Sequence, residues 1–279
     1  MAVAQAQSLP HAPGRPAGAF PQVPPRAGGD IAVTVTAYRG IDHAGTTLAP
    51  LALVAGPPGS GRSSFLQAAA AALARRPLAV PDLAWRDAPA LVRDGAARAV
   101  AQVRGPGGSV RLSWPDGGIS EHGCSPAATP AAAGLVPLLG MAPGARLTAL
   151  MGDPRGPGPH TPGAALAEAN ADLACLTDAA GWPPVTLDAD ARPARDGRPA
   201  ALLSGTQHAC VEILLRVVHA RRAGASAVVL DEAGALPRPL LAGLLALLGR
   251  AGVPALLAAP EAAPDAAGAG LGTTLALPA

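Results

Sequence analysis

The residues with the clearest chemical meaning form a glycine loop at 56–64, with the sequence GPPGSGRSS. The loop follows an apolar run at 51–55 and precedes an alanine-rich stretch at 65–73. A strand, the loop and a helix are therefore expected in that order. This is the context of the pattern G-x-x-x-x-G-K-[ST], in which backbone N–H groups surround a phosphate. The loop is predicted to bind the phosphates of a nucleotide.

Nine residues make up the predicted loop site. They are Gly56, Pro57, Pro58, Gly59, Ser60, Gly61, Arg62, Ser63 and Ser64. Gly56 and Gly61 let the backbone turn tightly and approach an anion, and the helix that follows adds free N–H groups. Ser63 stands at the position whose hydroxyl binds Mg²⁺, so ATP and Mg²⁺ are the expected ligands.

Arg62 departs from this pattern because it stands where lysine is expected. The chain contains no lysine, so the arginine fits the general composition as well as the site. Lysine carries a compact charge and arginine presents a wide planar fork, so the two side chains do not fill a slot in the same way. A glycine- and proline-rich turn without a ligand is the alternative interpretation.

Two carboxylates, Asp231 and Glu232, follow the apolar run 227–230 directly. The run is expected to be a buried strand, and α/β sheets bind ligands at the carboxyl ends of their strands. We predict that Asp231 helps to hold Mg²⁺ and that Glu232 is the general base for a water molecule facing the terminal phosphate. An exposed acidic pair at the end of a strand is the alternative.

Ser204 and Gly205 stand at the start of an expected helix, residues 206–222, within the block LSGTQ. Taken alone, Ser204 is a good helix cap. Because the block follows a glycine loop and precedes the acidic pair, its hydroxyl and free helix N–H groups form a second candidate phosphate contact.

The order of these blocks resembles the ABC-type ATPase heads of the SMC and RecF class, which act in chromosome maintenance and recombinational repair. The glycine loop resembles their Walker A motif, residues 203–207 resemble the LSGGQ signature, and residues 228–232 resemble Walker B with its catalytic glutamate. Residues 31–41 resemble the opening strand with its arginine–glycine turn, and residues 91–103 resemble the strands that follow.

The resemblance covers roughly residues 30–115 and 200–260. It implies an α/β P-loop NTPase fold, with an ABC-ATPase-like mixed sheet, flanking helices and an N-terminal antiparallel β lobe. We expect a disordered arm, one ATPase domain, an irregular or helical insertion within it, and a loose tail. Their expected bounds are 1–29, 30–260, 116–199 and 261–279 respectively.

If the family mechanism carries over, two copies of the chain form a homodimer with ATP between their heads. Ser204, Gly205 and Gln207 of one head would contact the ATP held by the Walker A loop of the other head. The resemblance also places Arg39 near the nucleotide, and it suggests DNA and a nuclease or another repair protein as partners.

Several positions depart from the family pattern. Thr206 replaces the second glycine of the signature, residues 256–260 carry no switch histidine, and residues 234–237 carry no aspartate. Gln102 lies within an expected strand and does not serve as the Q-loop glutamine. Two functions therefore stay open: an ATPase, and a catalytically degenerate nucleotide-binding or dimerisation module. A different P-loop enzyme, such as a small-molecule kinase, does not need the signature block.

Composition also bears on nucleic-acid binding, cellular compartment and membrane contact. The formal net charge of +2 is too small to indicate nucleic-acid binding by bulk electrostatics. Some arginines could meet DNA phosphates, but they are scattered, and we interpret them as solvated faces: Arg75, Arg76, Arg216, Arg221 and Arg222. The three cysteines form no CxxC pair, which fits a reducing cytoplasm. We find no signal-peptide pattern and no apolar run long enough for a bilayer, so we expect a cytoplasmic protein without membrane contact.

Periodicity and turn residues set the remaining elements. Strands are expected at 31–36, 41–47, 97–103, 109–114 and 253–258. Helices are expected at 164–180 and 240–248 and over part of 135–151. The first of these helices should begin at Thr161 and end at Gly181, whereas residues 187–199 are loop-like.

Overall fold

A computed structural model describes most of the chain between Ile31 and Pro278. The described residues are 31–48, 51–75, 85–105, 108–123, 142–151, 161–223, 225, 227–231, 233, 236–260 and 272–278. The expected disordered arm, residues 1–29, lies outside them, and so does Glu232.

Five strands of the N-terminal half form an antiparallel sheet in the order β2-β1-β4-β5-β6. Their bounds are Ile31–Tyr38 (β1), Ile41–Leu48 (β2), Ala99–Gly105 (β4), Gly108–Trp114 (β5) and Ile119–His122 (β6). The expected hairpin of β4 and β5 is confirmed, with Ala99 opposite Trp114 and Gly105 opposite Gly108. The alternation in β1 has its predicted effect, because Val33 and Val35 face the core.

A second sheet is entirely parallel and has the order β10-β11-β3-β12. Its strands are Leu51–Gly56 (β3), Val228–Leu230 (β10), Ala255–Pro260 (β11) and Gly272–Ala276 (β12). Alternate residues of β3 enter two different hydrophobic clusters, one on each face. Burial on both faces explains why β3 and β10 are continuous apolar runs. The expected mixture of parallel and antiparallel strands is present, divided between two sheets.

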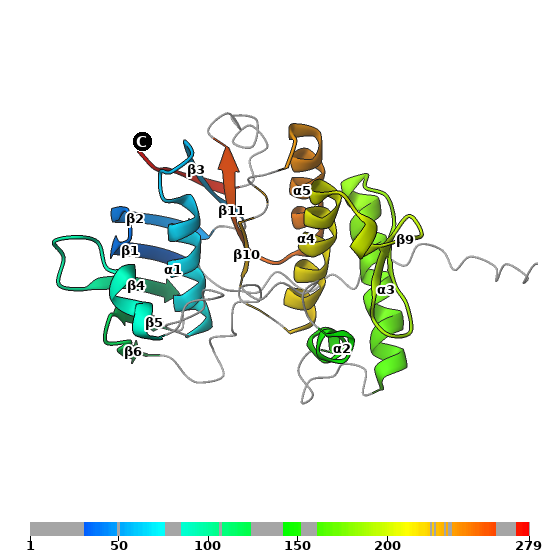
Figure 1. Ribbon diagram of the computed structural model, residues 1–279, viewed down its shortest axis with the longest axis horizontal. Helices are drawn as coiled ribbons and strands as arrows, with labels where there is room; N and C mark the ends of the chain where they lie inside the picture. Colours follow the sequence, from blue (N-terminus) through cyan, green and yellow to red (C-terminus); the bar gives the residue numbers. More distant parts are fainter. Residues whose placement is uncertain are drawn as a thin grey trace, which may run out of the picture.

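Helix α1, Arg62–Ala74, lies between the two sheets (Figure 1). Eight of its residues are buried, and five of these are alanines: Phe65, Leu66, Ala68, Ala69, Ala70, Ala71, Ala72 and Leu73. A helix buried around most of its circumference needs apolar residues on all sides. Small alanine side chains allow both sheets to approach the helix axis, which accounts for the alanine-rich run after the glycine loop.

On the other face of the parallel sheet lie helices α4 and α5, and α3 packs against these two helices on their outer side (Figure 1). Helices α3, α4 and α5 span Pro162–Ala180, Gly205–Arg222 and Arg238–Ala251, and the shorter α2, Pro143–Met151, packs against α3 and α4. Both predicted ends of α3 are confirmed. Thr161 caps its N-terminus by accepting a hydrogen bond from the N–H of Ala164, and Gly181 ends it in a left-handed conformation.

Two stretches differ from expectation because their strands are short. Residues 187–199 are not a plain loop, since Val185–Leu187 (β7), Pro193–Arg195 (β8) and Arg198–Pro199 (β9) form a small antiparallel sheet. Strands of two or three residues are too short to show an alternating pattern. The stretch is fixed instead by Asn170, whose side chain bonds both the N–H and the carbonyl oxygen of Leu187.

Part of the expected loose tail also belongs to the sheet. Strand β12 pairs with β3 along its whole length, from Gly272 opposite Leu51 to Ala276 opposite Ala55. The hydroxyl of Thr273 donates to the carbonyl oxygen of Thr47 at 2.6 Å, which ties β12 to strand β2 of the antiparallel sheet. The strand is read poorly from sequence because it is five residues long and lies in an alanine-, glycine- and proline-rich segment.

None of the described helices combines the length and the apolar character that a bilayer crossing requires.

Candidate functional site

The glycine loop connects the carboxyl end of β3 with the first turn of α1, as predicted. Gly59 and Gly61 have φ angles of 87° and 92°, a left-handed conformation that side-chain-bearing residues rarely adopt. A turn within the loop is closed by the N–H of Ser60, which donates to the carbonyl oxygen of Pro57 at 3.1 Å. The N–H of Phe65 then donates to the carbonyl oxygen of Gly61 at 2.8 Å and begins the helix.

Gly56 is required at the start of the loop because other atoms approach its backbone closely. A Cβ atom there would contact the hydroxyl of Ser60 and lie 3.0 Å from the carbonyl oxygen of Leu277. The N–H of Leu277 in turn donates to the carbonyl oxygen of Ala55 at 2.8 Å. The chain after β12 therefore supports the first residue of the loop. Sequence reasoning missed Leu277, because a backbone contact carries no residue-type signal.

Ser63 and Asp231 meet at this end of the parallel sheet. The hydroxyl of Ser63 donates a 3.0 Å hydrogen bond to Oδ1 of Asp231. Asp231 directly follows the last residue of β10, and Ser63 is the second residue of α1. The two predicted metal ligands are thus brought together from positions 168 residues apart in the sequence, and both side chains keep some solvent access.

This pair fits a magnesium ion that is shared with phosphate groups. Mg²⁺ takes one or two protein oxygen ligands and completes its shell with water and phosphate oxygens. Within the described ranges no cluster of three or more His, Cys, Asp or Glu side chains gathers as a metal site. A hydroxyl and one carboxylate next to a phosphate loop are the donor set expected for this use of the ion.

Arg62 reaches from the first turn of α1 to the neighbouring strand. Its Nη1 donates a 2.7 Å hydrogen bond to the carbonyl oxygen of Ala259 in β11. Ala259 lies beside Ala55 in the sheet, and its exposed fraction is 1%. The adjacent residues Arg62 and Ser63 therefore contact the carboxyl ends of two different strands.

Arg39 lies beside the same helix. It belongs to the tight turn between β1 and β2, where its φ angle is 50° and its N–H donates to the carbonyl oxygen of Leu91 at 2.9 Å. Its Nη1 donates to Oε1 of Gln67 at 2.8 Å. Gln67 stands one helical turn after Ser63, so the structure brings Arg39 to the helix that begins at the glycine loop. Gln67 was not among the predicted residues.

The signature residues form an exposed helix terminus. Ser204 caps α4, its backbone N–H donates to Oε1 of Gln207 at 3.0 Å, and its hydroxyl accepts from the N–H of Gln207. This reciprocal pair is a capping box. Gly205 and Thr206 are exposed, and Leu202 just before them has an exposed fraction of 74%.

The structure does not bring the signature to the glycine loop of the same chain. Helix α4 packs on the face of the parallel sheet that is opposite to α1. Among the described residues, no hydrogen bond or ion pair joins Ser204, Gly205 or Gln207 to the loop.

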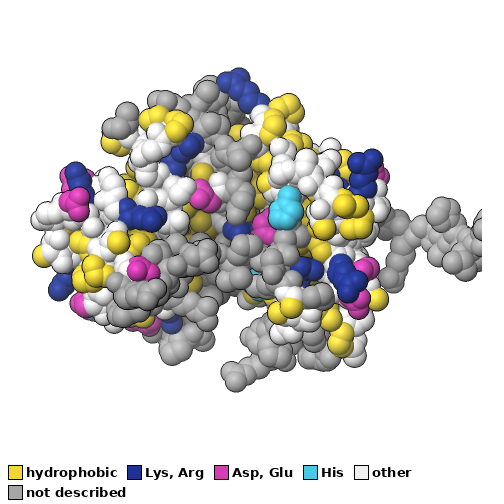
Figure 2. Space-filling model, in the orientation of Figure 1, with side chains coloured by type: hydrophobic (Ala, Val, Ile, Leu, Met, Phe, Trp, Pro, Cys, Tyr) yellow, Lys and Arg dark blue, Asp and Glu magenta, His cyan; other side chains and the backbone are white. Residues whose placement is uncertain are grey.

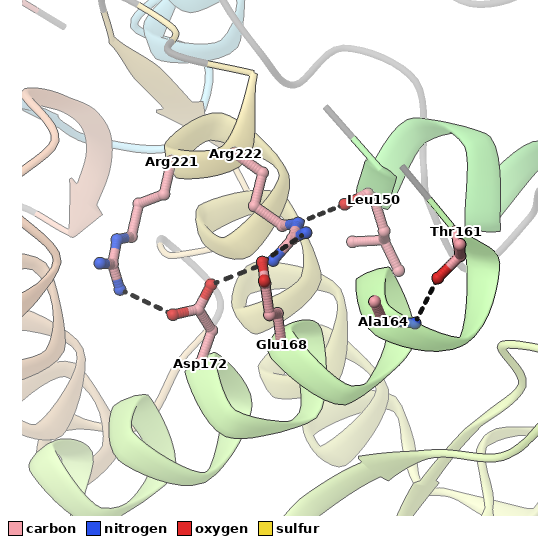
Figure 3. Close-up of polar contacts among 7 residues, drawn as sticks. All are labelled: Leu150, Thr161, Ala164, Glu168, Asp172, Arg221 and Arg222. Carbon is pink, nitrogen blue, oxygen red and sulfur yellow. Dashed lines mark hydrogen bonds and ion pairs between the residues drawn. The ribbon is translucent and has the colours of Figure 1, made fainter. Parts of the chain in front are cut away.

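The arginines of α4 are internal ties, which corrects their interpretation as solvated faces. Arg216 is buried and its Nε lies 2.6 Å from Oε1 of Glu212. Arg221 and Arg222 pair with Asp172 of α3 at 3.3 and 3.9 Å, as Figure 3 shows. They are poorly exposed because α4 lies between the other helices, a tertiary effect that periodicity alone does not reveal.

The end of α2 is held by the same arginine cluster. Arg222 also pairs with Glu168 at 3.1 Å and donates from Nε to the carbonyl oxygen of Leu150 (Figure 3). The carbonyl oxygen of Ala149 lies 2.7 Å from Nδ1 of His219, so His219 is a packing residue. The last carbonyls of a helix lack partners within the helix and favour a nearby cation.

Two solved structures of ATPase-type heads resemble most of this chain. An SMC head bound to the C-terminal winged-helix domain of ScpA matches with a TM-score of 0.57 and 11% sequence identity, over 82% of this chain and 88% of that chain. The recombination mediator RecF with ATP matches with a TM-score of 0.54 and 9% identity, over 86% of this chain and 94% of that one. No family model and no curated protein sequence matches.

The chain has the fold of SMC and RecF heads. The resemblance predicted from the glycine loop, the signature block and the acidic strand end is thereby confirmed at the level of the fold. In this SMC- and RecF-like head the glycine loop, Arg39, Ser63 and Asp231 cluster around the start of α1. Glu232 lies outside the described residues, so its role as a general base stays a prediction.

Proposed function

We propose that this protein is an ATP-binding head of the SMC and RecF type, which binds ATP with Mg²⁺ at the glycine loop. The observation that carries the proposal is the 3.0 Å contact between Ser63 and Asp231 below a loop with two left-handed glycines. A Mg²⁺ ion shared with phosphates in the loop would contact both this hydroxyl and this strand-end carboxylate. The fold of SMC and RecF heads supports the same function.

Each part of the site has a separate task in this proposal. Pro57 and Pro58 have no backbone N–H, and the N–H of Ser60 is bonded to the carbonyl oxygen of Pro57. The phosphate cradle therefore depends on the amides of Gly59 and of residues 61–64 and on the charge of Arg62. Ser63 and Asp231 would hold Mg²⁺, which when bound neutralises charge on the phosphates. Arg39 would lie at the side of the bound nucleotide.

The exposed signature supports ATP-dependent dimerisation. Because α4 lies across the parallel sheet from α1, the cap formed by Ser204, Gly205 and Gln207 is directed to solvent and not to the chain's own loop. A second head would bring its loop to this cap, and the free N–H groups of α4 would then face the terminal phosphate. The proposed assembly is a homodimer with ATP between the heads.

The proposal also covers ATP hydrolysis and the cellular process in which the protein acts. Glu232 would accept a proton from the attacking water at the end of β10. We propose a cytoplasmic role in DNA repair, recombination or chromosome maintenance, with DNA and a repair protein or nuclease as partners. The α4 arginines give the DNA contact no support, since Arg216, Arg221 and Arg222 are paired inside the head. On the face drawn in Figure 2, basic and acidic side chains are interspersed.

A second function is favoured by two specific features. Arg62 replaces the loop lysine and already bonds the carbonyl oxygen of Ala259, and β11 ends without a histidine. Both features favour a head that binds nucleotide and dimerises but does not hydrolyse ATP.

The deciding experiment titrates ATP into the protein with and without Mg²⁺ by calorimetry and measures the molar mass by light scattering. The proposal predicts Mg²⁺-dependent binding that doubles the mass, and both effects should be lost in Asp231→Ala. The matched control is Asp196→Ala, an exposed aspartate in the turn between β8 and β9. No binding at millimolar ATP would refute the function.

Turnover separates the two functions. ATP loss that disappears in Glu232→Gln identifies an ATPase. Binding and dimerisation without turnover identify the degenerate module.

A further inference from the structure

The side chain of Arg62 connects two parts of the fold that are 197 residues apart in the sequence. Its backbone belongs to the first turn of α1, directly after the glycine loop, and its Nη1 is bonded to the carbonyl oxygen of Ala259 at 2.7 Å. The pairing of β10 with β11 ends at Leu230 and Leu257, so β11 extends beyond its neighbour at this point. Arg62 thus supplies a donor to a carbonyl in the extension of β11.

An arginine can serve this carbonyl and a phosphate at the same time. The guanidinium carries five N–H donors spread over a planar fork, so a bond from Nη1 leaves the donors of Nη2 and Nε for other acceptors. The ammonium group of lysine carries all its donors on a single atom. A lysine would have to bring that atom within hydrogen-bond distance of both acceptors together.

We propose that Arg62 is a positioning residue that links phosphate bound in the glycine loop to the carboxyl end of β11. A phosphate bonded to Nη2 and Nε would hold the guanidinium in one orientation. The guanidinium would then hold the carbonyl oxygen of Ala259 through Nη1. The loop therefore requires arginine and not the lysine of the standard pattern. This inference rests on the proposed function, because the phosphate is that of bound ATP.

Through this link β11 takes part in the site with a backbone carbonyl, which no residue pattern in the strand indicates. Residues 258–260 end on the same edge of the sheet as Asp231, so they lie at the site without presenting a polar side chain of their own. A carbonyl held by the phosphate ligand makes the position of this strand end depend on whether the loop is occupied. The chain lacks lysine altogether, and the geometry gives this one arginine a function that composition does not explain.

Amide hydrogen exchange tests the link without relying on activity. Exchange over residues 255–259 is measured by mass spectrometry in the wild type and in Arg62→Lys, each without nucleotide and with saturating Mg²⁺–ATP. In the wild type, ATP should slow exchange at these amides several-fold. Arg62→Lys should bind ATP roughly tenfold more weakly and show no slowing at saturation.

The control is Arg198→Lys, the same exchange of side chains at an exposed position of β9, which should match the wild type. The wild-type comparison tests the link even where Arg62→Lys melts at a lower temperature. Unchanged exchange in wild type that binds ATP overturns the inference and leaves the proposed function intact. Equal slowing in Arg62→Lys overturns it as well. No ATP binding to the wild type removes the proposed function and the inference together.

Discussion

The hydroxyl of Ser63 and the carboxylate of Asp231 lie 168 residues apart in the sequence and 3.0 Å apart in the structure. Their contact exists because α1 starts above the carboxyl end of the parallel sheet, where β10 ends at Leu230. In the sheet, β11 lies between β10 and β3, the strand that leads into the glycine loop. The start of α1 spans the carboxyl end of β11, where Arg62 contacts Ala259, and so brings Ser63 to Asp231. Neither side chain alone would identify a metal site.

This contact predicts that Ser63 and Asp231 act as one unit in binding Mg²⁺–ATP. Ser63→Ala and Asp231→Asn should each weaken binding about tenfold or more, and the double variant should be little worse than either single variant. Without Mg²⁺ the differences from wild type should shrink. The measurement is a calorimetric double-mutant cycle, with Ser120→Ala on the exposed strand β6 as the control. Fully additive effects would show that the two residues act separately.

The sequence was sufficient for the local elements of the site and insufficient for its supports. The glycine loop, the acidic strand end and the capped start of α4 follow from residue type and order, because turns, buried strands and caps have strong local preferences. Leu277 supports the loop through its backbone atoms, and Arg62 bonds a backbone carbonyl, that of Ala259. Nearly every residue type supplies a backbone carbonyl and N–H, so no sequence pattern marks Leu277 or Ala259 as supports of the site.

The arginines of α4 illustrate a second limit. Arg221 and Arg222 belong to a helix whose exposed and buried faces depend on how α2 and α3 pack around it. The sequence shows charged residues at the end of a helix, which commonly face solvent. Only the tertiary arrangement places Asp172 of α3 beside them. Burial dominates the electrostatics of this carboxyl and raises its pKa, while Arg221 and Arg222 act in the opposite direction.

Because Tyr38 is buried, we predict that the protein loses stability at alkaline pH. Its ring is fully buried and contacts Trp114 edge-on, with ring centroids 5.0 Å apart. Burial raises the pKa of its hydroxyl from 10.0 to about 12. Because the folded-state pKa is the higher one, the folded state holds the proton more tightly than the unfolded state. The contribution of Tyr38 is complete below pH 10 and is lost as the pH rises toward 12, by about 2–3 kcal/mol in total.

The chain is well suited to this measurement because it has one tyrosine and no lysine. The free energy of unfolding should be determined by denaturant titration across this pH range, and tyrosinate absorbance should report Tyr38 alone. Tyr38→Phe should remove most of the alkaline slope. A variant with the same slope as wild type would assign the effect to other groups.

Helix α5 approaches the end of α3 so closely at Gly243 that no side chain fits. A Cβ atom on Gly243 would lie 2.6 Å from Nε1 of Trp182 and would also contact the carbonyl oxygen of Ala180. Gly243→Ala should therefore lower the free energy of unfolding by about 1–3 kcal/mol. Gly249 of the same helix has open space around it, so Gly249→Ala should be neutral or stabilising by up to about 1 kcal/mol.

Denaturant unfolding of both glycine variants checks this contrast. Helix propensity favours alanine at both positions, so only the contact with Trp182 and Ala180 distinguishes them. Equal effects of the two substitutions would contradict the close approach.

We predict that removing Arg222, a poorly exposed ion-pair partner, lowers the free energy of unfolding much more than removing an exposed one. Its side chain is 8% exposed and contacts Glu168, Asp172 and the last turn of α2. Arg222→Ala should destabilise the protein by about 1–3 kcal/mol, because the packing of a poorly exposed side chain is lost and the helix-end carbonyl of Leu150 loses its donor, while Asp172 keeps Arg221. Arg192 pairs with Asp190 at 3.3 Å, with side chains 65% and 61% exposed, and Arg192→Ala should cost no more than about 0.5 kcal/mol.

Denaturant unfolding measures both values, and DNA binding should be compared only for variants that stay folded. If Arg222→Ala keeps wild-type stability and loses DNA affinity, Arg222 is a DNA contact and its role as an internal tie is wrong.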